Sequence, residues 1–198
     1  MTIAIIGSGA IGRALATRFA VRGIEVQLAN SRGPESLAPL AAELGASIHP
    51  AALAEALKAE VVILAVPFDA VSSVVHDAAA WEGRVVVDAT NAIDFPAFTP
   101  RDLGGRSSSS IIAEMVPGAQ LVKAFNTLPA ALLAEEPAQA GGRRVLFLSG
   151  DDAAANTLVS KLIERLGFAP ITLGTLSAGG LLQQFGSALM VHNLIRQG

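Results

Sequence analysis

The residues with the clearest chemical potential are three glycines near the start of the chain. Gly7, Gly9 and Gly12 form a G-x-G-x-x-G pattern between an apolar run at residues 3–6 and a helical pattern at residues 13–22. In such a strand–turn–helix unit the first glycine permits a tight turn, the second lets a phosphate reach the backbone, and the third lets helix and strand pack closely. The helix N-terminus adds free N–H groups and a partial positive charge. The pattern predicts a dinucleotide site, and its alternative is an ordinary glycine-containing turn.

Polar residues follow the second predicted strand, residues 25–28, where a domain of this kind selects its nucleotide. Asn30, Ser31 and Arg32 stand about 20 residues beyond the glycine turn, where an NAD site usually places Asp or Glu on the ribose 2′-hydroxyl. A carboxylate would repel a 2′-phosphate, whereas an amide, a hydroxyl and a guanidinium would bind one. The sequence therefore favours NADP(H) over NAD(H). The alternative is a polar turn with a solvated arginine.

The ends of three later strands supply further candidates. Strands are predicted at residues 60–67, 84–88 and 120–124, and open α/β sheets bind ligands at the carboxyl ends of their strands. Val66, Pro67 and Phe68 could line the nicotinamide side of the cleft, with core packing as the alternative for Phe68. Asn91 and Asn126 follow the other two strands and point to the same crevice.

Two charged residues within these strands receive structural interpretations. Asp88 is expected to bind loop N–H groups rather than act as a base, because a nicotinamide site alone requires no base. Lys123 lies in an apolar run, and we expect its side chain to extend its ammonium group to the surface.

The alternation of strand and helix patterns predicts an α/β fold with a mostly parallel, doubly wound sheet of the Rossmann type. The 198 residues are 52% hydrophobic and 16% charged, which suits one compact domain over 1–198. Residues 1–127 would form the dinucleotide-binding core, and residues 128–198 would form an extension packed on it. The loop at residues 93–106 is long enough to suggest a function.

Composition narrows the chemistry and the partners. The chain has no cysteine, which excludes disulfides, thiolate metal sites and a cysteine nucleophile, and no metal site is predicted. It has no tyrosine for the tyrosine–lysine pair of many carbonyl reductases. The net charge of −3 and the lack of a basic stripe indicate no nucleic-acid partner. With no leader and no long apolar run, we expect a cytoplasmic protein without a membrane partner.

The C-terminal pattern suggests an oligomer. Residues 176–196 are predicted to be mostly helical, and apolar residues surround much of the helix at residues 181–195. A helix of this kind is either fully buried or part of a contact between copies. We expect a homodimer on this basis.

Several segments together resemble one family. They are MTIAIIGSGAIG, LANSRGPESL, VILAVPFDAV, VVVDATNAI, LVKAFNTLPA and LFLSGDD. In this order they resemble the short bacterial relatives of NADPH-dependent coenzyme F420 reductase, the F420-dependent NADP oxidoreductases. They are also similar to the oxidoreductase domain of the STEAP ferric reductases. The resemblance covers nearly the whole chain.

The resemblance implies a Rossmann-type domain, extended by C-terminal strands and helices, that transfers hydride between NADP(H) and a flat second cofactor. It implies that the diphosphate lies on Gly7, Ser8, Gly9, Ala10, Ile11 and Gly12, and the 2′-phosphate on Asn30, Ser31 and Arg32. It places the nicotinamide end near Val66, Pro67, Phe68, Ala124 and Asn126. No catalytic residue and no F420-binding residue can be transferred, so the acceptor could be F420, a flavin or a metal chelate.

Two other functions fit parts of the sequence. An imine or carbonyl reductase of the pyrroline-5-carboxylate reductase type resembles the N-terminal half, but normally adds a larger all-helical C-terminal region with a catalytic lysine. A non-catalytic NADP(H)-binding redox sensor is the other alternative.

Overall fold

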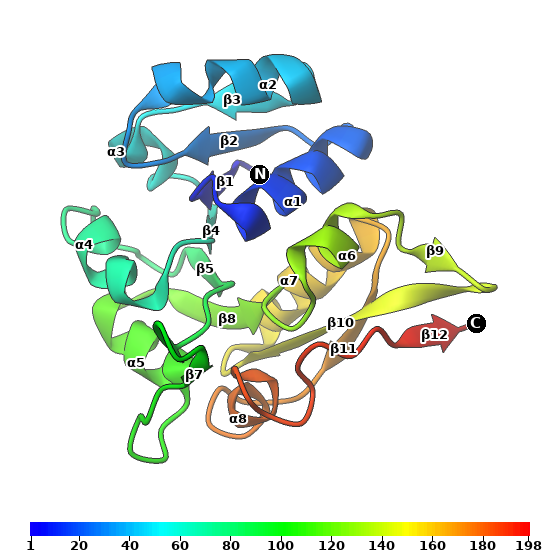
Figure 1. Ribbon diagram of the computed structural model, residues 1–198. Coiled ribbons are helices and arrows are strands. Elements are labelled where there is room, and N and C mark those ends of the chain that lie inside the picture. Colours follow the sequence, from blue (N-terminus) through cyan, green and yellow to red (C-terminus); the bar gives the residue numbers. More distant parts are fainter.

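The computed structural model describes residues 1–198 and has an α/β architecture. Six parallel strands form the centre of its main sheet in the order β8-β5-β4-β1-β2-β3 (Figure 1). Their bounds are β1 Ile3–Ile6, β2 Val26–Ala29, β3 Ile48–Pro50, β4 Val61–Leu64, β5 Val85–Asp88 and β8 Gln120–Ala124. Chain order reverses between β1 and β4, which makes this pair the topological switch point where open α/β sheets hold ligands.

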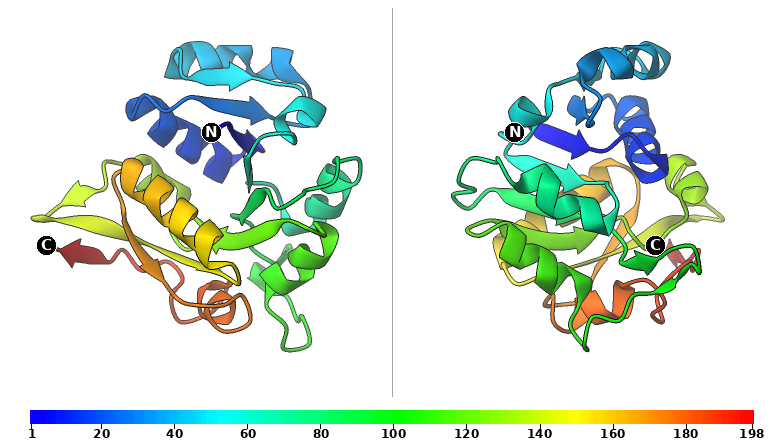
Figure 2. Two further views of the ribbon diagram at one scale, coloured as in Figure 1. Left: turned by 180° about the vertical axis from the view of Figure 1, so that it is seen from behind. Right: turned by 60° about the vertical axis from the view of Figure 1, so that its left-hand side comes forward.

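Helices cover both faces of the sheet. One face carries α1 (Ala10–Val21), α2 (Ala38–Leu44) with the preceding 3₁₀ turn η1 (Pro34–Leu37), α6 (Ala130–Ala134) and α7 (Ala153–Arg165). The other carries α3 (Leu53–Ala56), η2 (Phe68–Ala70), α4 (Val71–Val75) and α5 (Ser108–Met115). Figure 2 shows α7 lying across β8 and β10 in its left panel, and α4 beside α5 in its right panel.

Alternating residues of each central strand feed the two cores. In β1, Ile3 and Ile5 join the cluster beneath α1 and α7, whereas Ala4 and Ile6 join the cluster beneath α4 and α5. Successive side chains of a strand point to opposite faces, so a strand buried on both faces must be apolar throughout. This explains the continuous apolar runs in the sequence.

The C-terminal part of the chain continues the same sheet. Strand β10 (Gly142–Gly150) runs antiparallel to β8 and parallel to β11 (Ala169–Thr172). Its first residues pair with the short strands β9 (Ala138–Gln139) and β12 (Ile195–Gln197), and the three form an arm that ends beside the C-terminus (Figure 1). The predicted fold class, a mostly parallel doubly wound sheet with C-terminal additions, is confirmed.

The predicted helix over residues 176–196 is wrong. Only α8 (Gly179–Gln183) is helical there, and the chain then runs irregularly to β12. Gly186 has φ +84° and packs on Pro100, with an added Cβ only 2.2 Å from that ring's Cγ. The N–H of Val191 donates to Thr127 O at 2.8 Å, and Asn193 Oδ1 accepts from Arg144. Contacts with distant segments thus override a helical pattern, and the helix that motivated the homodimer is absent.

The predicted loop at residues 93–106 contains a hairpin of two short strands, β6 (Ile93–Asp94) and β7 (Thr99–Pro100). It follows β5 directly and therefore begins at the carboxyl edge of the sheet. None of the helices has the length and apolarity needed to cross a membrane.

Candidate functional site

A cavity of about 310 Å³ lies at the switch point between β1 and β4. The glycine loop, the turn after β2 and the segment after β4 form its walls, through Gly7, Ser8, Gly9, Asn30, Ser31, Arg32, Val66 and Pro67 among others. The structure therefore brings together eight of the predicted site residues. A cavity of about 420 Å³ against Gly141, Arg143 and Gln197 lies on the arm formed by β9, β10 and β12, outside the six central strands.

The three glycines of the loop are present for different reasons. Gly7 has φ +115°, and an added Cβ would lie 2.2 Å from Ala65 O. At Gly12 it would lie 1.9 Å from Gly7 O, so helix α1 could not approach β1 as closely. Gly9 differs, because its φ is −72° and nothing lies within 4 Å of an added Cβ. Nothing in the protein itself requires glycine at residue 9, whereas a diphosphate lying on the backbone would.

The N-terminus of α1 closes this side of the cavity. Its N-cap is Gly9, which offers no capping side chain, and its first turn contains no acidic residue. The first N–H groups of a helix have no partner within the helix, and they carry the positive end of its dipole. Ala10, Ile11 and Gly12 form that first turn beside the cavity. The chain thus leaves an anion site open at this point.

Asn30 connects the glycine loop to the turn after β2. Its Nδ2 donates to Ser8 Oγ and to Ser36 Oγ, both at 3.0 Å, and its Oδ1 accepts from the N–H of Arg32 at 2.9 Å. The side chain is only 9% exposed. Asn30 occupies the place of the usual NAD-site carboxylate, so this amide holds the two loops together without adding a negative charge.

Ser31 and Arg32 are both exposed, and neither side chain has a hydrogen-bond or ion-pair partner in the protein. A free guanidinium and a free hydroxyl at the rim of the cavity are suited to a phosphate on the ribose. These residues, the glycine loop and the helix N-terminus together fit NADP(H).

Four further predicted residues follow β4, β5 and β8 or end β8, and three of them are buried. Phe68 is 9% exposed and packs in the core beneath α4. Ala124 and Asn126 are 0% and 1% exposed. Asn91 lies beside Asn126, and each amide donates to the other residue: Asn91 Nδ2 to Asn126 O, and Asn126 Nδ2 to Asn91 Oδ1, both at 3.0 Å. These four residues do not line the cavity described above, and their contact with a cofactor stays a prediction.

Gln183 on α8 completes this amide pair and was missed by the sequence reasoning. It is fully buried, donates from Nε2 to Asn126 Oδ1 at 3.2 Å, and accepts at Oε1 from Ser149 Oγ at 2.7 Å. Its carbonyl also accepts from Asn126 Nδ2 at 2.6 Å. We call Asn91, Asn126 and Gln183 the amide network. A glutamine in a helical pattern gives no signal in sequence, because only the tertiary fold brings α8 onto β8.

A buried ion pair lies under the same strand ends. Lys123 Nζ donates to Asp88 Oδ2 at 3.0 Å and to Thr90 O at 3.1 Å, and both charged side chains are 0% exposed. The expectation that Lys123 extends to the surface is wrong, because Asp88 is its neighbour in register on β5. Asp88 has the expected structural role: Oδ1 accepts from the N–H of Thr90 at 2.9 Å, and Oδ2 also accepts from Ser109 Oγ.

Arg101 connects the hairpin after β5 to the segment that follows β4. Its Nε donates to Asp94 at 2.8 Å, and its two terminal nitrogens donate to both oxygens of Asp69. The guanidinium carbon lies 5.8 Å from the centre of the Phe68 ring. Hydrogen bonds from Arg101 hold the pKa of the Asp69 carboxyl below its usual range, and those carboxylates raise the pKa of Arg101.

Several known proteins are similar to this chain in sequence and in fold. Residues 2–92 match the family model described as NADP oxidoreductase, coenzyme F420-dependent. A hypothetical protein of Sinorhizobium meliloti, SMa0349, is 57% identical; the match covers 99% of this chain and 96% of that one, with a TM-score of 0.96. A putative F420-dependent NADP-reductase from Arthrobacter sp. FB24 is 29% identical, with a TM-score of 0.80 over 99% of this chain and 100% of that one.

The metalloreductase STEAP3 of Rattus norvegicus is 30% identical over 177 residues, which is 89% of this chain and 34% of that protein. The chain thus spans about a third of the length of the curated relatives it matches. These findings confirm the predicted resemblance to F420-dependent NADP oxidoreductases and to STEAP reductases. The chain belongs to one family with SMa0349, and it shares sequence and fold with F420-dependent NADP oxidoreductases.

Proposed function

We propose that the protein is an NADP-dependent oxidoreductase, and that it transfers hydride between NADP(H) and a flat redox acceptor, either F420 or a flavin. The choice of NADP(H) is supported by Ser31 and Arg32, whose side chains have no partner in the protein. They lie beside a glycine loop whose second glycine is not required by the fold. NADPH held by the glycine loop and the Ser31–Arg32 pair would supply a hydride from its nicotinamide C4, and the acceptor ring would take up this hydride together with a proton from water.

The chain's own residues bind and orient in this proposal. The glycine loop and the N-terminus of α1 hold the diphosphate, and Arg32 with Ser31 holds the 2′-phosphate. Val66 and Pro67 lie against the ribose next to the nicotinamide. The amide network fixes the ends of β5 and β8, so that the far wall of the crevice stays rigid. Such catalysis depends on holding two rings face to face, and the cofactor supplies the reaction.

The imine or carbonyl reductase alternative receives less support. That class needs a larger helical C-terminal region, whereas residues 142–198 form strands β10, β11 and β12 with α7 and the short α8. A lysine acting on substrate must reach it, and Lys123 is fully buried and bound to Asp88. The other alternative is a non-catalytic NADP(H)-binding redox sensor. A protein that binds the cofactor and reduces no acceptor would support it.

The test is turnover with a panel of acceptors. Purified protein would be mixed with NADPH and, separately, F420, FMN, FAD or a ferric chelate, and the loss of NADPH absorbance would be followed. The ferric chelate is included because of the likeness to metalloreductases. We expect turnover with F420 or a flavin. Turnover with the chelate alone, or with none of the four, would contradict the acceptor class.

We also propose that the protein is a homodimer and that it is cytoplasmic. Its expected partner is a small-molecule acceptor, and neither nucleic acid nor a membrane is expected as a partner. The dimer now rests on exposed apolar side chains near the C-terminus, namely Leu182, Val191 and Leu194. Sedimentation velocity of the purified chain would test it, and a single monomeric species would contradict it.

A further inference from the structure

Three phenylalanine rings form a cluster at the hairpin that follows β5. Phe98 lies edge-to-face with Phe95, with ring centres 5.8 Å apart, and edge-to-face with Phe185, with ring centres 5.2 Å apart. Phe95 is 72% exposed and Phe98 is 60% exposed. We call Phe95, Phe98 and Phe185 the aromatic shelf. Adjacent phenylalanines left in water form an apolar patch of the kind that marks a binding surface.

The backbone conformation of Phe98 is unfavourable as well. Its φ is +54°, in the left-handed region that favours glycine and asparagine and that a bulky residue rarely adopts. The fold would therefore be served better by another residue at this position, both for the backbone and for the solvent. A phenylalanine that is unfavourable in both respects indicates that the ring itself is needed.

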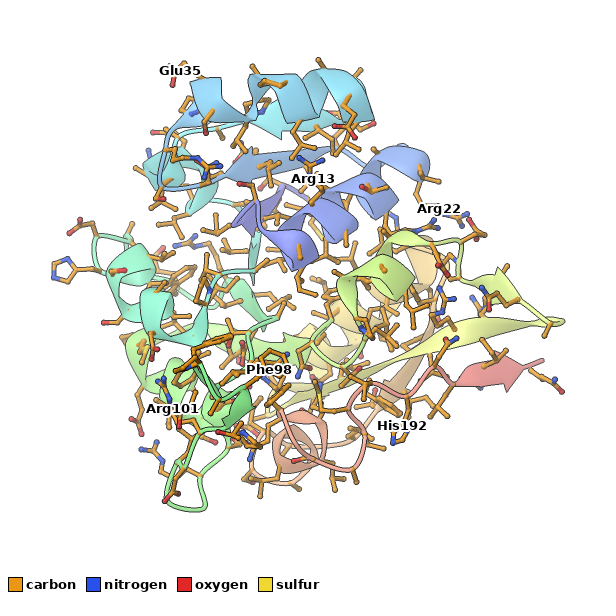
Figure 3. All side chains as sticks on the ribbon, viewed as in Figure 1. Arg13, Arg22, Glu35, Phe98, Arg101 and His192 are labelled. Carbon is orange, nitrogen blue, oxygen red and sulfur yellow. The ribbon has the colours of Figure 1, made fainter.

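The aromatic shelf is tied to the segments that follow two of the central strands. On one side Arg101 ties its hairpin to Asp69, which lies two residues after Pro67 of the cavity wall. On the other side Phe185 lies two residues after Gln183, whose side chain bonds to Asn126 at the end of β8. Figure 3 shows Arg101 at the base of the hairpin and Phe98 towards the middle of the molecule. The shelf thus joins the segment after β4 to the segment after β8.

We propose that the aromatic shelf binds the tricyclic ring of the acceptor, an isoalloxazine or its 5-deaza form, with Phe98 in contact with that ring. This inference rests on the proposed function, which needs a flat ring held against the nicotinamide. The shelf offers aromatic faces and edges and no hydrogen-bond donor, and such surfaces favour a flat aromatic ligand over a small carbonyl compound or a hydrated ion. Phe98 is then a residue that determines the class of acceptor.

Two substitutions separate this role from a structural one. Phe98→Asn removes the ring and suits the left-handed backbone, so we expect an unchanged or higher melting temperature. We expect it to weaken ring binding about tenfold, the scale of one aromatic stacking contact. Phe98→Tyr keeps the ring and should bind like the wild type. NADPH affinity should be the same in all three proteins.

The measurement is equilibrium titration of FMN, 5-deaza-FMN and F420 in the presence of NADP⁺, followed by ligand fluorescence, with sedimentation velocity on each protein. Binding of FMN alone or of the two deaza compounds alone would identify which form of the ring the shelf accepts. Ring binding that is equal in wild type and Phe98→Asn would overturn the role of Phe98 and leave the proposed function intact. A wild type that binds NADPH but none of the three rings would overturn the acceptor class, and the shelf role with it. A dimeric wild type with a monomeric Phe98→Asn would show instead that a second copy covers the shelf.

Discussion

At the β2 end of the crevice, the guanidinium of Arg32 and the hydroxyl of Ser31 have no partner in the protein. At the β5 and β8 end, the amides of Asn91, Asn126 and Gln183 bond to one another, and Lys123 is bound to Asp88. Unpartnered exposed groups are available to a charged ligand, whereas polar groups buried in mutual hydrogen bonds fix a backbone. The first end is therefore suited to recognise a phosphate, and the second to present a rigid wall to a ring.

This comparison also explains why one end was easier to predict. Residues that recognise an anion must carry particular chemical types close to one another in sequence, as Asn30, Ser31 and Arg32 do. A wall built from the ends of several strands draws residues from distant parts of the chain. Gln183 and Asn126 are 57 residues apart.

The largest expected effect is a loss of stability at the β5 and β8 end. Lys123→Met removes the ammonium and leaves Asp88 buried without its partner, which typically costs about 3–5 kcal/mol. Urea unfolding would measure the loss in the free energy of unfolding. Arg32→Ala is the matched control, because its exposed side chain has no partner, and we expect it to stay within about 0.5 kcal/mol of wild type.

The double variant Lys123→Met with Asp88→Asn should recover part of this loss, because no unpaired charge then remains. A loss below about 1 kcal/mol for Lys123→Met alone would show that the pair does not hold this end together.

The next effect separates two glycines of one loop. Gly12→Ala places a Cβ 1.9 Å from Gly7 O, and such overpacking costs about 1–3 kcal/mol or more. Gly9→Ala meets nothing within 4 Å and should leave stability within about 0.5 kcal/mol of wild type. It should nevertheless weaken NADPH binding. Thermal unfolding and cofactor titration of both variants would check this, and unaltered NADPH affinity in Gly9→Ala would contradict the position assigned to the diphosphate.

A smaller effect tests the recognition end. Arg32→Ala should weaken NADPH binding by about tenfold or more, since a hydrogen bond to a charged group contributes about 1.5–3 kcal/mol. NADH lacks the 2′-phosphate and should lose less than about twofold. Arg196→Ala, at an exposed position on β12, removes the same charge elsewhere and should change neither affinity. Equal losses for both nucleotides would show that Arg32 does not read the 2′-phosphate.

The smallest effect concerns pH at the base of the hairpin. Arg101 lowers the pKa of Asp69 in the folded protein, so the pair stabilises the hairpin above the usual carboxyl pKa and loses this effect as the pH falls through the lower folded value. We expect amide exchange in residues 93–100 to show constant protection from pH 8 to 5, after correction for intrinsic rates, and a loss only below about pH 4. Asp69→Asn should abolish that acid-induced change. A change between pH 7 and 5 would assign it to another group.

Two predictions from the sequence are wrong, and the fold shows the reason for each. Lys123 looked like a surface-reaching lysine because its own strand is apolar, and its partner Asp88 lies 35 residues earlier. The C-terminal helical pattern was broken by Pro100 packing on Gly186 and by the pairing of β12 with β10. In each case the deciding contact joins residues far apart in the chain.

By itself the sequence determined the glycine loop, the turn that favours a 2′-phosphate, and the sheet built from continuous apolar runs. These features follow from local rules, because a turn, a helix start and a strand buried on both faces each need particular residue types within a few positions. The tertiary structure alone decided that Lys123 is buried on Asp88, that Gln183 closes the amide network, and that Phe95, Phe98 and Phe185 meet. Those outcomes depend on which strand ends become neighbours, and that adjacency is a property of the folded sheet rather than of any one segment.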